Sequence, residues 1–137
     1  MKTIARTAFG SLALLYLLLE ATALVRGHAP YLELLPLSLA PIALLALALE
    51  VPHRNVWHVL GACVVVVVFA AANAMAYVQI TTPSAYAEIV SLRVYGVSYQ
   101  VLFWLKYMLA TLGLVSSFLF HVSRLGRKQP CLDAGPA

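Results

Sequence analysis

Charged residues are scarce in this sequence. Only 10% of its 137 residues are Asp, Glu, Lys or Arg, whereas soluble domains carry about 25%. Hydrophobic residues make up 63% of the chain, and its mean hydropathy is +0.91. A soluble fold of this size cannot bury so much apolar surface, so lipid must cover part of it. The composition therefore predicts an integral membrane protein.

Cysteine pairs and common catalytic motifs are also missing. Cys63 and Cys131 are not arranged as CxxC, which argues against dithiol redox chemistry. The sequence contains no P-loop, HExxH or GxSxG motif, and these are the sites of common hydrolytic and nucleotide chemistry. The sequence thus favours a protein that is not an enzyme, and it predicts no catalytic residue.

Long apolar runs are what the sequence does contain. Crossing about 30 Å of hydrocarbon takes a helix of about 20 residues, and the candidate spans are residues 7–25, 33–49, 56–78 and 99–121. Pro36 and Pro41 interrupt the second, which is either a tilted span or a re-entrant segment. Short connections predict antiparallel neighbours. We therefore expect a single all-α domain over residues 1–137, an antiparallel four-transmembrane-helix bundle.

Lysine and arginine are distributed unevenly, which predicts the orientation in the membrane. With the N-terminus inside, six of them flank the cytoplasmic span ends and two flank the external ends. The cytoplasmic set is Lys2, Arg6, Arg54, Arg124, Arg127 and Lys128, and the external set is Arg26 and Arg93. We expect a multi-pass protein of the cell membrane with both termini in the cytoplasm. Its basic tail, residues 122–137, would lie against anionic headgroups, so the isoelectric point near 9.3 requires no nucleic-acid partner.

The first apolar run has a second interpretation. Lys2 and Arg6, the apolar residues 9–19 and the small residues 21–23 resemble a secretory signal with a cleavage site. Glu20, directly before the small residues, is unfavourable for cleavage. The favoured interpretation is a retained first span.

The connection at residues 79–98 is too long for an ordinary loop and should have structure of its own. Thr82 followed by Pro83 is a favourable helix start, which predicts a short interfacial helix on the external side. Its shared face would carry Tyr86, Ile89, Val90 and Arg93. The alternation in "VSLRVYGVSY", residues 90–99, leaves a strand as the alternative.

Three polar residues are expected at one depth inside the bundle. Lys106 lies about 10 Å below the external surface, and Glu20 and Asn73 lie about 9 Å below it. A lone charge in a span costs about 2.5–3.5 kcal/mol on insertion scales, and a Glu20–Lys106 pair would reduce this cost. Lys106 could instead extend to the external surface without a partner. Both interpretations stay open.

Two histidines fall near the cytoplasmic ends of the third and fourth spans. His58 and His121 could face each other there, and two histidines on neighbouring helices can hold a haem or a metal ion. No acidic or cysteine ligand accompanies them, so solvated histidines are the favoured interpretation. Glu50, His53 and Arg54 are expected to form a surface cluster of small energetic value.

Small residues four positions apart predict where helices approach closely in lipid. These pairs are Ala70 with Ala74, Ala72 with Ala76, and Gly113 with Ser117. Such faces, together with the absence of catalytic motifs, favour a non-catalytic accessory or anchor subunit of a larger membrane complex. Its partners would be the lipid bilayer and other membrane subunits or further copies of the chain.

Two alternatives stay open. The first is a small homo-oligomeric transporter that uses Glu20 and Lys106, although a neutralising lysine would make proton uptake by Glu20 harder. The second is an electron-transfer module, with haem at His58 and His121 or a quinone in the polar layer. The cofactor is therefore unknown at this point.

Overall fold

The computed structural model describes residues 1–25, 35–91, 93–94 and 96–126. Within this part, three helices are long and apolar enough to cross a membrane. They are α1 (Lys2–Val25), α3 (Asn55–Thr81) and α5 (Tyr99–Arg124). The described chain is mostly helical, which fits the all-α prediction, but three helices reach the length of a span in this part where four were predicted. The first connection, with Arg26, and the tail from Arg127 onward, both used above to predict orientation, lie outside the described residues.

The expected second span is shorter than the others. α2 (Leu35–Ala48) has 14 residues, which at 1.5 Å per residue gives about 21 Å, less than the thickness of the hydrocarbon core. Pro41 lies inside this helix, and Pro52 follows it before α3 begins. Within the described residues, α2 is therefore an apolar helix that is shorter than a span.

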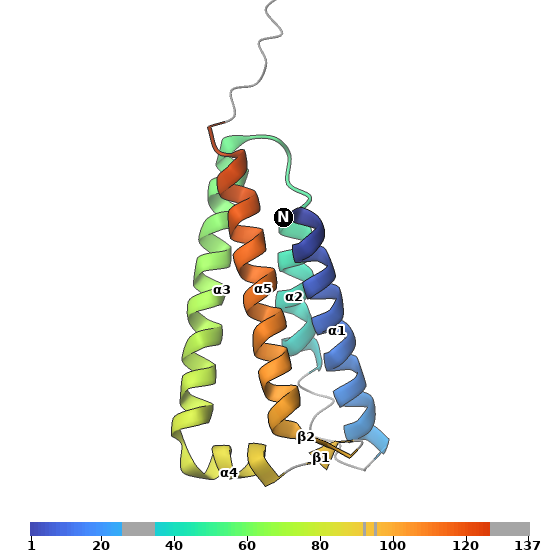
Figure 1. Cartoon of the computed structure of the whole chain (residues 1–137). Helices are drawn as coiled ribbons and strands as arrows, with labels where there is room; N and C mark the ends of the chain where they lie inside the picture. The colour runs from blue at the N-terminus through green and yellow to red at the C-terminus, as the bar shows by residue number, and fades with distance from the viewer. Residues whose placement is uncertain (26–34, 92, 95, 127–137) are drawn as a thin grey trace, which may run out of the picture.

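α1, α2, α3 and α5 run alternately up and down, and α5 lies between α1 and α3 (Figure 1). α5 packs against α1 on one side and α3 on the other, and α1 also packs against α2. A short turn connects α2 to α3, but the two helices make few contacts with each other. These two helices are therefore consecutive in the sequence without being packed against each other. The start of α1, the end of α2, the start of α3 and the end of α5 share one end of the molecule. We call this the basic end, because Lys2, Arg6, Arg54 and Arg124 belong to it.

The best-packed region joins α1 to α5. A Cβ atom added to Gly113 would lie 2.5 Å from Cε1 of Phe9, so the Phe9 ring lies directly on the α5 backbone. Ser117, one turn later, is fully buried. The predicted close approach at Gly113 and Ser117 is confirmed, whereas Ala70 and Ala74 on α3 are exposed. The buried apolar cluster consists of Ala5, Phe9, Leu12, Ile42, Leu45, Leu49, Val65, Leu114 and Phe120.

The opposite end, which we call the hairpin end, contains both structures that the sequence permitted. α4 (Pro83–Ser91) begins where Thr82 and Pro83 predicted a helix start and packs against α3 and α5. β1 (Arg93–Val94) and β2 (Val97–Ser98) then form an antiparallel hairpin, with Gly96 in its turn at a φ of 77° that favours glycine. Arg93 pairs with Ser98 in this hairpin. Its expected place on the helical face was wrong, because the helix ends at Ser91.

Candidate functional site

Lys106 is held by tyrosines. Its Nζ donates a hydrogen bond to Tyr99 Oη at 3.1 Å, and it lies 5.2 Å from the centroid of the Tyr99 ring and 5.5 Å from that of Tyr16. Tyr99 opens α5 at the hairpin end, so Lys106 extends toward that end, as a snorkelling side chain does. Among the described residues Lys106 forms no ion pair with Glu20.

The other two residues of the expected polar layer have different surroundings. Asn73 Oδ1 accepts a hydrogen bond from the Tyr107 hydroxyl at 2.6 Å, and Asn73 Nδ2 donates to the Phe69 carbonyl at 2.8 Å. This contact joins α3 to α5. Glu20 Oε2 is buried and has no hydrogen-bond partner in the described part of the chain. The layer is thus two separate polar contacts and one unpaired carboxylate oxygen.

His58 and His121 are brought together at the basic end. Their Nδ1 atoms are 3.2 Å apart, and both side chains are buried, with 2% and 0% of their surface exposed. The interpretation as solvated histidines was wrong, because α3 and α5 pack most closely here. Gly61 makes this possible, since a Cβ at that position would lie 2.5 Å from Cε1 of His121.

The histidine contact limits what this site can hold. One Nδ1–H must donate the hydrogen bond and the other Nδ1 must be unprotonated to accept it, so the contact needs at least one neutral ring. The Nε2 atoms of His58 and His121 are buried without partners, as is Ser117 Oγ. A buried polar atom without a partner costs about 1–3 kcal/mol. The pair is therefore a well-packed but incompletely bonded polar group.

Haem does not fit between these rings. Metal–imidazole bonds of about 2.0–2.1 Å would place two axial nitrogens about 4 Å apart with a porphyrin between them, whereas the rings here are in direct contact. The edge of Phe120 also packs against both His58 and His121. Structural zinc takes four ligands. His58 and His121 supply two, and the described residues contain no group of three His, Cys, Asp or Glu side chains placed to hold a metal ion.

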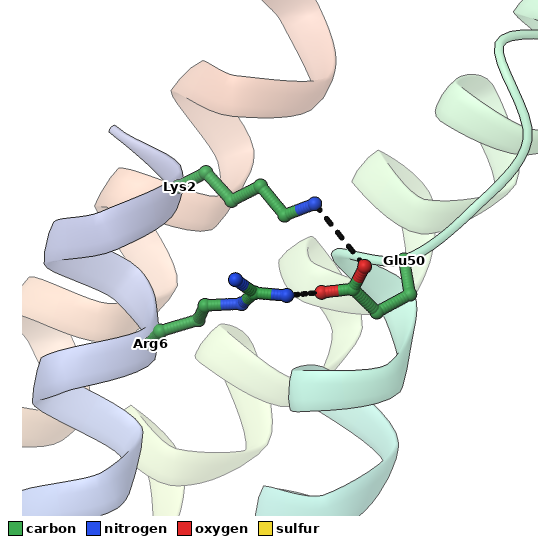
Figure 2. A network of polar contacts seen from close by, with 3 residues as sticks. All are labelled: Lys2, Arg6 and Glu50. Atoms are coloured by element: carbon green, nitrogen blue, oxygen red, sulfur yellow. Dashed lines mark hydrogen bonds and ion pairs between the residues drawn. The ribbon is translucent and has the colours of Figure 1, made fainter.

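A charged cluster that the sequence did not predict lies beside the histidines. Lys2 and Arg6 both form ion pairs with Glu50, and the Lys2 Nζ to Glu50 Oε2 distance is 3.2 Å (Figure 2). Glu50 follows α2, where a carboxylate is unfavourable for the helix dipole, and the two cations offset that. The ion pairs described for Glu50 are thus made with α1, and none of them involves His53 or Arg54, with which a surface cluster was expected. The available signal was the four-residue spacing of Lys2 and Arg6, which puts both on one face of α1.

No protein-family model, curated protein or solved structure matches this chain.

Proposed function

We propose that this chain is a non-catalytic accessory or anchor subunit of a larger membrane complex. In this proposal α1, α3 and α5 cross the cell membrane, α2 is a short fourth helix within it, and the basic end faces the cytoplasm. The orientation is supported by the gathering of Lys2, Arg6, Arg54 and Arg124 at one end, because positively charged residues favour the cytoplasmic side.

The observation that carries the proposal is the open face of α3. In the apolar 18-residue stretch of each helix, only 11% of the residues are buried in α3, against 22% in α1 and 28% in α5. Its buried residues, which all lie in its first half, are His58, Gly61, Ala62 and Val65. The rest of α3 contributes no buried residue to the described fold.

That open face has the composition of a helix interface. Cys63, Ala70 and Ala74 are exposed and are spaced by seven and four residues, so they share one face of α3. Beside Ala74 is a shallow depression lined by Ala74, Met75, Val78 and Gln79. Small residues of this spacing let a second helix approach closely in lipid, as Gly113 does for α1 within the chain. The occupant we propose is a transmembrane helix of another subunit.

The experiment compares two neighbouring alanines. The tagged full-length chain is purified in mild detergent and its mass is measured by light scattering. We expect the wild-type complex to contain a stoichiometric partner, Ala70→Leu to release it, and Ala71→Leu to retain it, because Ala71 is exposed about 100° around the helix. A monomeric wild-type chain, or equal behaviour of the two variants, would contradict the proposal.

Cys63 tests whether the partner is a second copy. In a Cys131→Ser background, mild oxidation of membranes would link two copies through Cys63 if their α3 helices face each other. A heteromeric complex would show the same sensitivity to Ala70→Leu with no linked dimer.

The packing of α1 supports a retained first helix. α1 contacts both α5 and α2, and Phe9 covers Gly113. Cleavage within residues 21–23 would uncover this surface of α5. The intact mass of the purified protein decides the point, and a mass lacking about twenty residues would restore the signal-peptide interpretation.

A second candidate, a proton-coupled transporter, is favoured by Glu20. The objection to it was that Lys106 neutralises this carboxylate, and in this structure Lys106 binds Tyr99 while Glu20 Oε2 has no partner among the described residues. Ionisable residues within spans are functional candidates. Proton flux into liposomes, followed with an internal pH-sensitive dye, should be abolished by Glu20→Gln and unaffected by Glu50→Gln. Absence of flux in the wild type would remove this candidate.

A further inference from the structure

The charged cluster at the basic end is larger than the ion pairs of Figure 2. Lys2 Nζ lies 5.9 Å from the centroid of the Phe120 ring, and Arg124 Cζ lies 5.5 Å from the same centroid. Lys2 and Arg6 also share Glu50. Lys2 therefore links the two groups, because it contacts both the Phe120 ring and the Glu50 carboxylate, whereas Arg6 contacts the carboxylate and Arg124 contacts the ring. We call these five residues the cationic cluster.

The cationic cluster has an excess of positive charge. Lys2, Arg6 and Arg124 contribute three positive charges and Glu50 one negative charge, so its net charge is three minus one, +2. Glu50 is the one carboxylate that the described ion pairs bring to it. A lysine has three N–H donors and an arginine five, so one carboxylate uses only a fraction of them. The side chains of Lys2 and Arg6 are 36% and 55% exposed, which leaves those donors accessible.

The backbone adds to this positive potential. Lys2 and Arg6 lie in the first two turns of α1, whose first turn carries no acidic residue. The first N–H groups of a helix have no intrahelical partner, and that end of the helix dipole is positive. The start of α1 therefore points unneutralised donors toward the same end of the molecule.

The location of the cationic cluster indicates which kind of anion it would bind. Its residues lie within the first two turns of α1, within the last two turns of α5 or two residues after the end of α2, and α1 and α5 are long and apolar enough to span a membrane. Residues at such helix ends meet the headgroup layer, and basic pockets between helix ends bind anionic headgroups. Phe120 is 8% exposed and supplies an apolar floor beneath the cations.

We propose that the cationic cluster binds the phosphate group of an anionic phospholipid. A phosphodiester is a monoanion whose oxygens accept charge-assisted hydrogen bonds from lysine and arginine, which suits a cluster with two excess charges. A choline or ethanolamine headgroup brings a compensating cation and is disfavoured there. This inference rests on the membrane placement of α1 and α5 in the proposed function, and it is independent of any partner subunit.

The test is lipid retention by the purified full-length chain in native mass spectrometry. The probes are phosphatidylglycerol, phosphatidylcholine with the same acyl chains, and inorganic phosphate. We expect one phosphatidylglycerol per chain, retained at least tenfold better than phosphatidylcholine and not displaced by millimolar phosphate. Equal retention of the two lipids would overturn the proposal, and displacement by phosphate would assign the cluster to a soluble anion.

Four variants separate charge from structure. Arg124→Gln leaves both ion pairs of Glu50 intact and should weaken phosphatidylglycerol retention at least threefold, and Lys2→Gln should weaken it similarly. Glu50→Gln breaks the ion pairs but raises the net charge, so retention should hold or increase. Arg93→Gln removes the same charge from the hairpin end and should change nothing. Loss of retention in Glu50→Gln would show that the network is only structural.

Failure of the lipid site and failure of the accessory-subunit role would give different results. A chain that is monomeric in lipid nanodiscs and still retains phosphatidylglycerol selectively would exclude the accessory-subunit role and keep the lipid site. Circular dichroism of each variant confirms its helical fold before retention is compared.

Discussion

α3 and α5 have almost the same length, 27 and 26 residues, and both meet the requirements for crossing a membrane. α5 nevertheless packs against α1 and α3, while α3 is buried only near its start. The difference lies in which small residues are covered. Gly113, Ser116 and Ser117 of α5 are buried, whereas Ala70, Ala71 and Ala74 of α3 are exposed. In lipid, apolarity does not drive helices together, and small residues that allow close packing do.

The largest loss of stability is expected from a substitution at Gly113, where α1 packs on α5. In Gly113→Ala the new Cβ would meet the buried Phe9 ring at 2.5 Å, and overpacking of this kind typically costs about 1–3 kcal/mol. We expect the upper part of that range, because Phe9 has little room to move. Gly10→Ala on α1 is the matched control. A Cβ there meets nothing within 4 Å, so the change should stabilise the helix by about 0.5–1 kcal/mol. Thermal unfolding in detergent, followed by circular dichroism, measures both, and equal effects would contradict the packing described.

Gly61 tests the close contact of α3 with the His121 ring of α5. Gly61→Ala would push a methyl group into the His121 ring, and His121→Ala would leave His58 Nδ1 without its partner. Each should be destabilising, but in the double variant the smaller side chain at 121 makes room for the methyl group. We expect a coupling energy of about 1–2 kcal/mol in a double-mutant cycle of unfolding, within the range for residues in contact. Additive effects would mean that the two residues do not touch.

The smallest effect is expected in the half of α3 that lies toward the hairpin end. Tyr107→Phe removes the hydroxyl that donates to Asn73 Oδ1, and interhelical hydrogen bonds in membranes average about 0.6 kcal/mol. Tyr77→Phe on α3 is the control, because Tyr77 is 69% exposed and should tolerate the change. Unfolding in a graded detergent mixture resolves differences of this size. A loss above about 2 kcal/mol would show that this half of α3 is held more firmly than its low burial indicates.

The positions of the long helices could be predicted from the sequence, but the side chains that meet between different helices mostly could not. The start of α4 at Pro83 and the close approach at Gly113 follow from local rules on helix starts and small residues, and both are found. The sequence analysis stated that His58 and His121 could face each other, but it expected their side chains to be solvated and they are buried. The partners of Glu50 were assigned to the neighbouring turn, because local spacing says nothing about which distant helix passes nearby.

The sequence by itself determined that this chain is helical and apolar enough to enter a membrane, since hydrophobic run length and helix-start residues are properties of short segments. Only the tertiary structure decided which charges meet. It directs Lys106 to Tyr99, leaves Glu20 Oε2 unpaired among the described residues, and joins Glu50 to α1. The physical reason is that the rotation and lateral order of helices in lipid depend on a few close packing contacts. Those contacts involve residues far apart in the chain, such as Phe9 with Gly113 and Gly61 with His121.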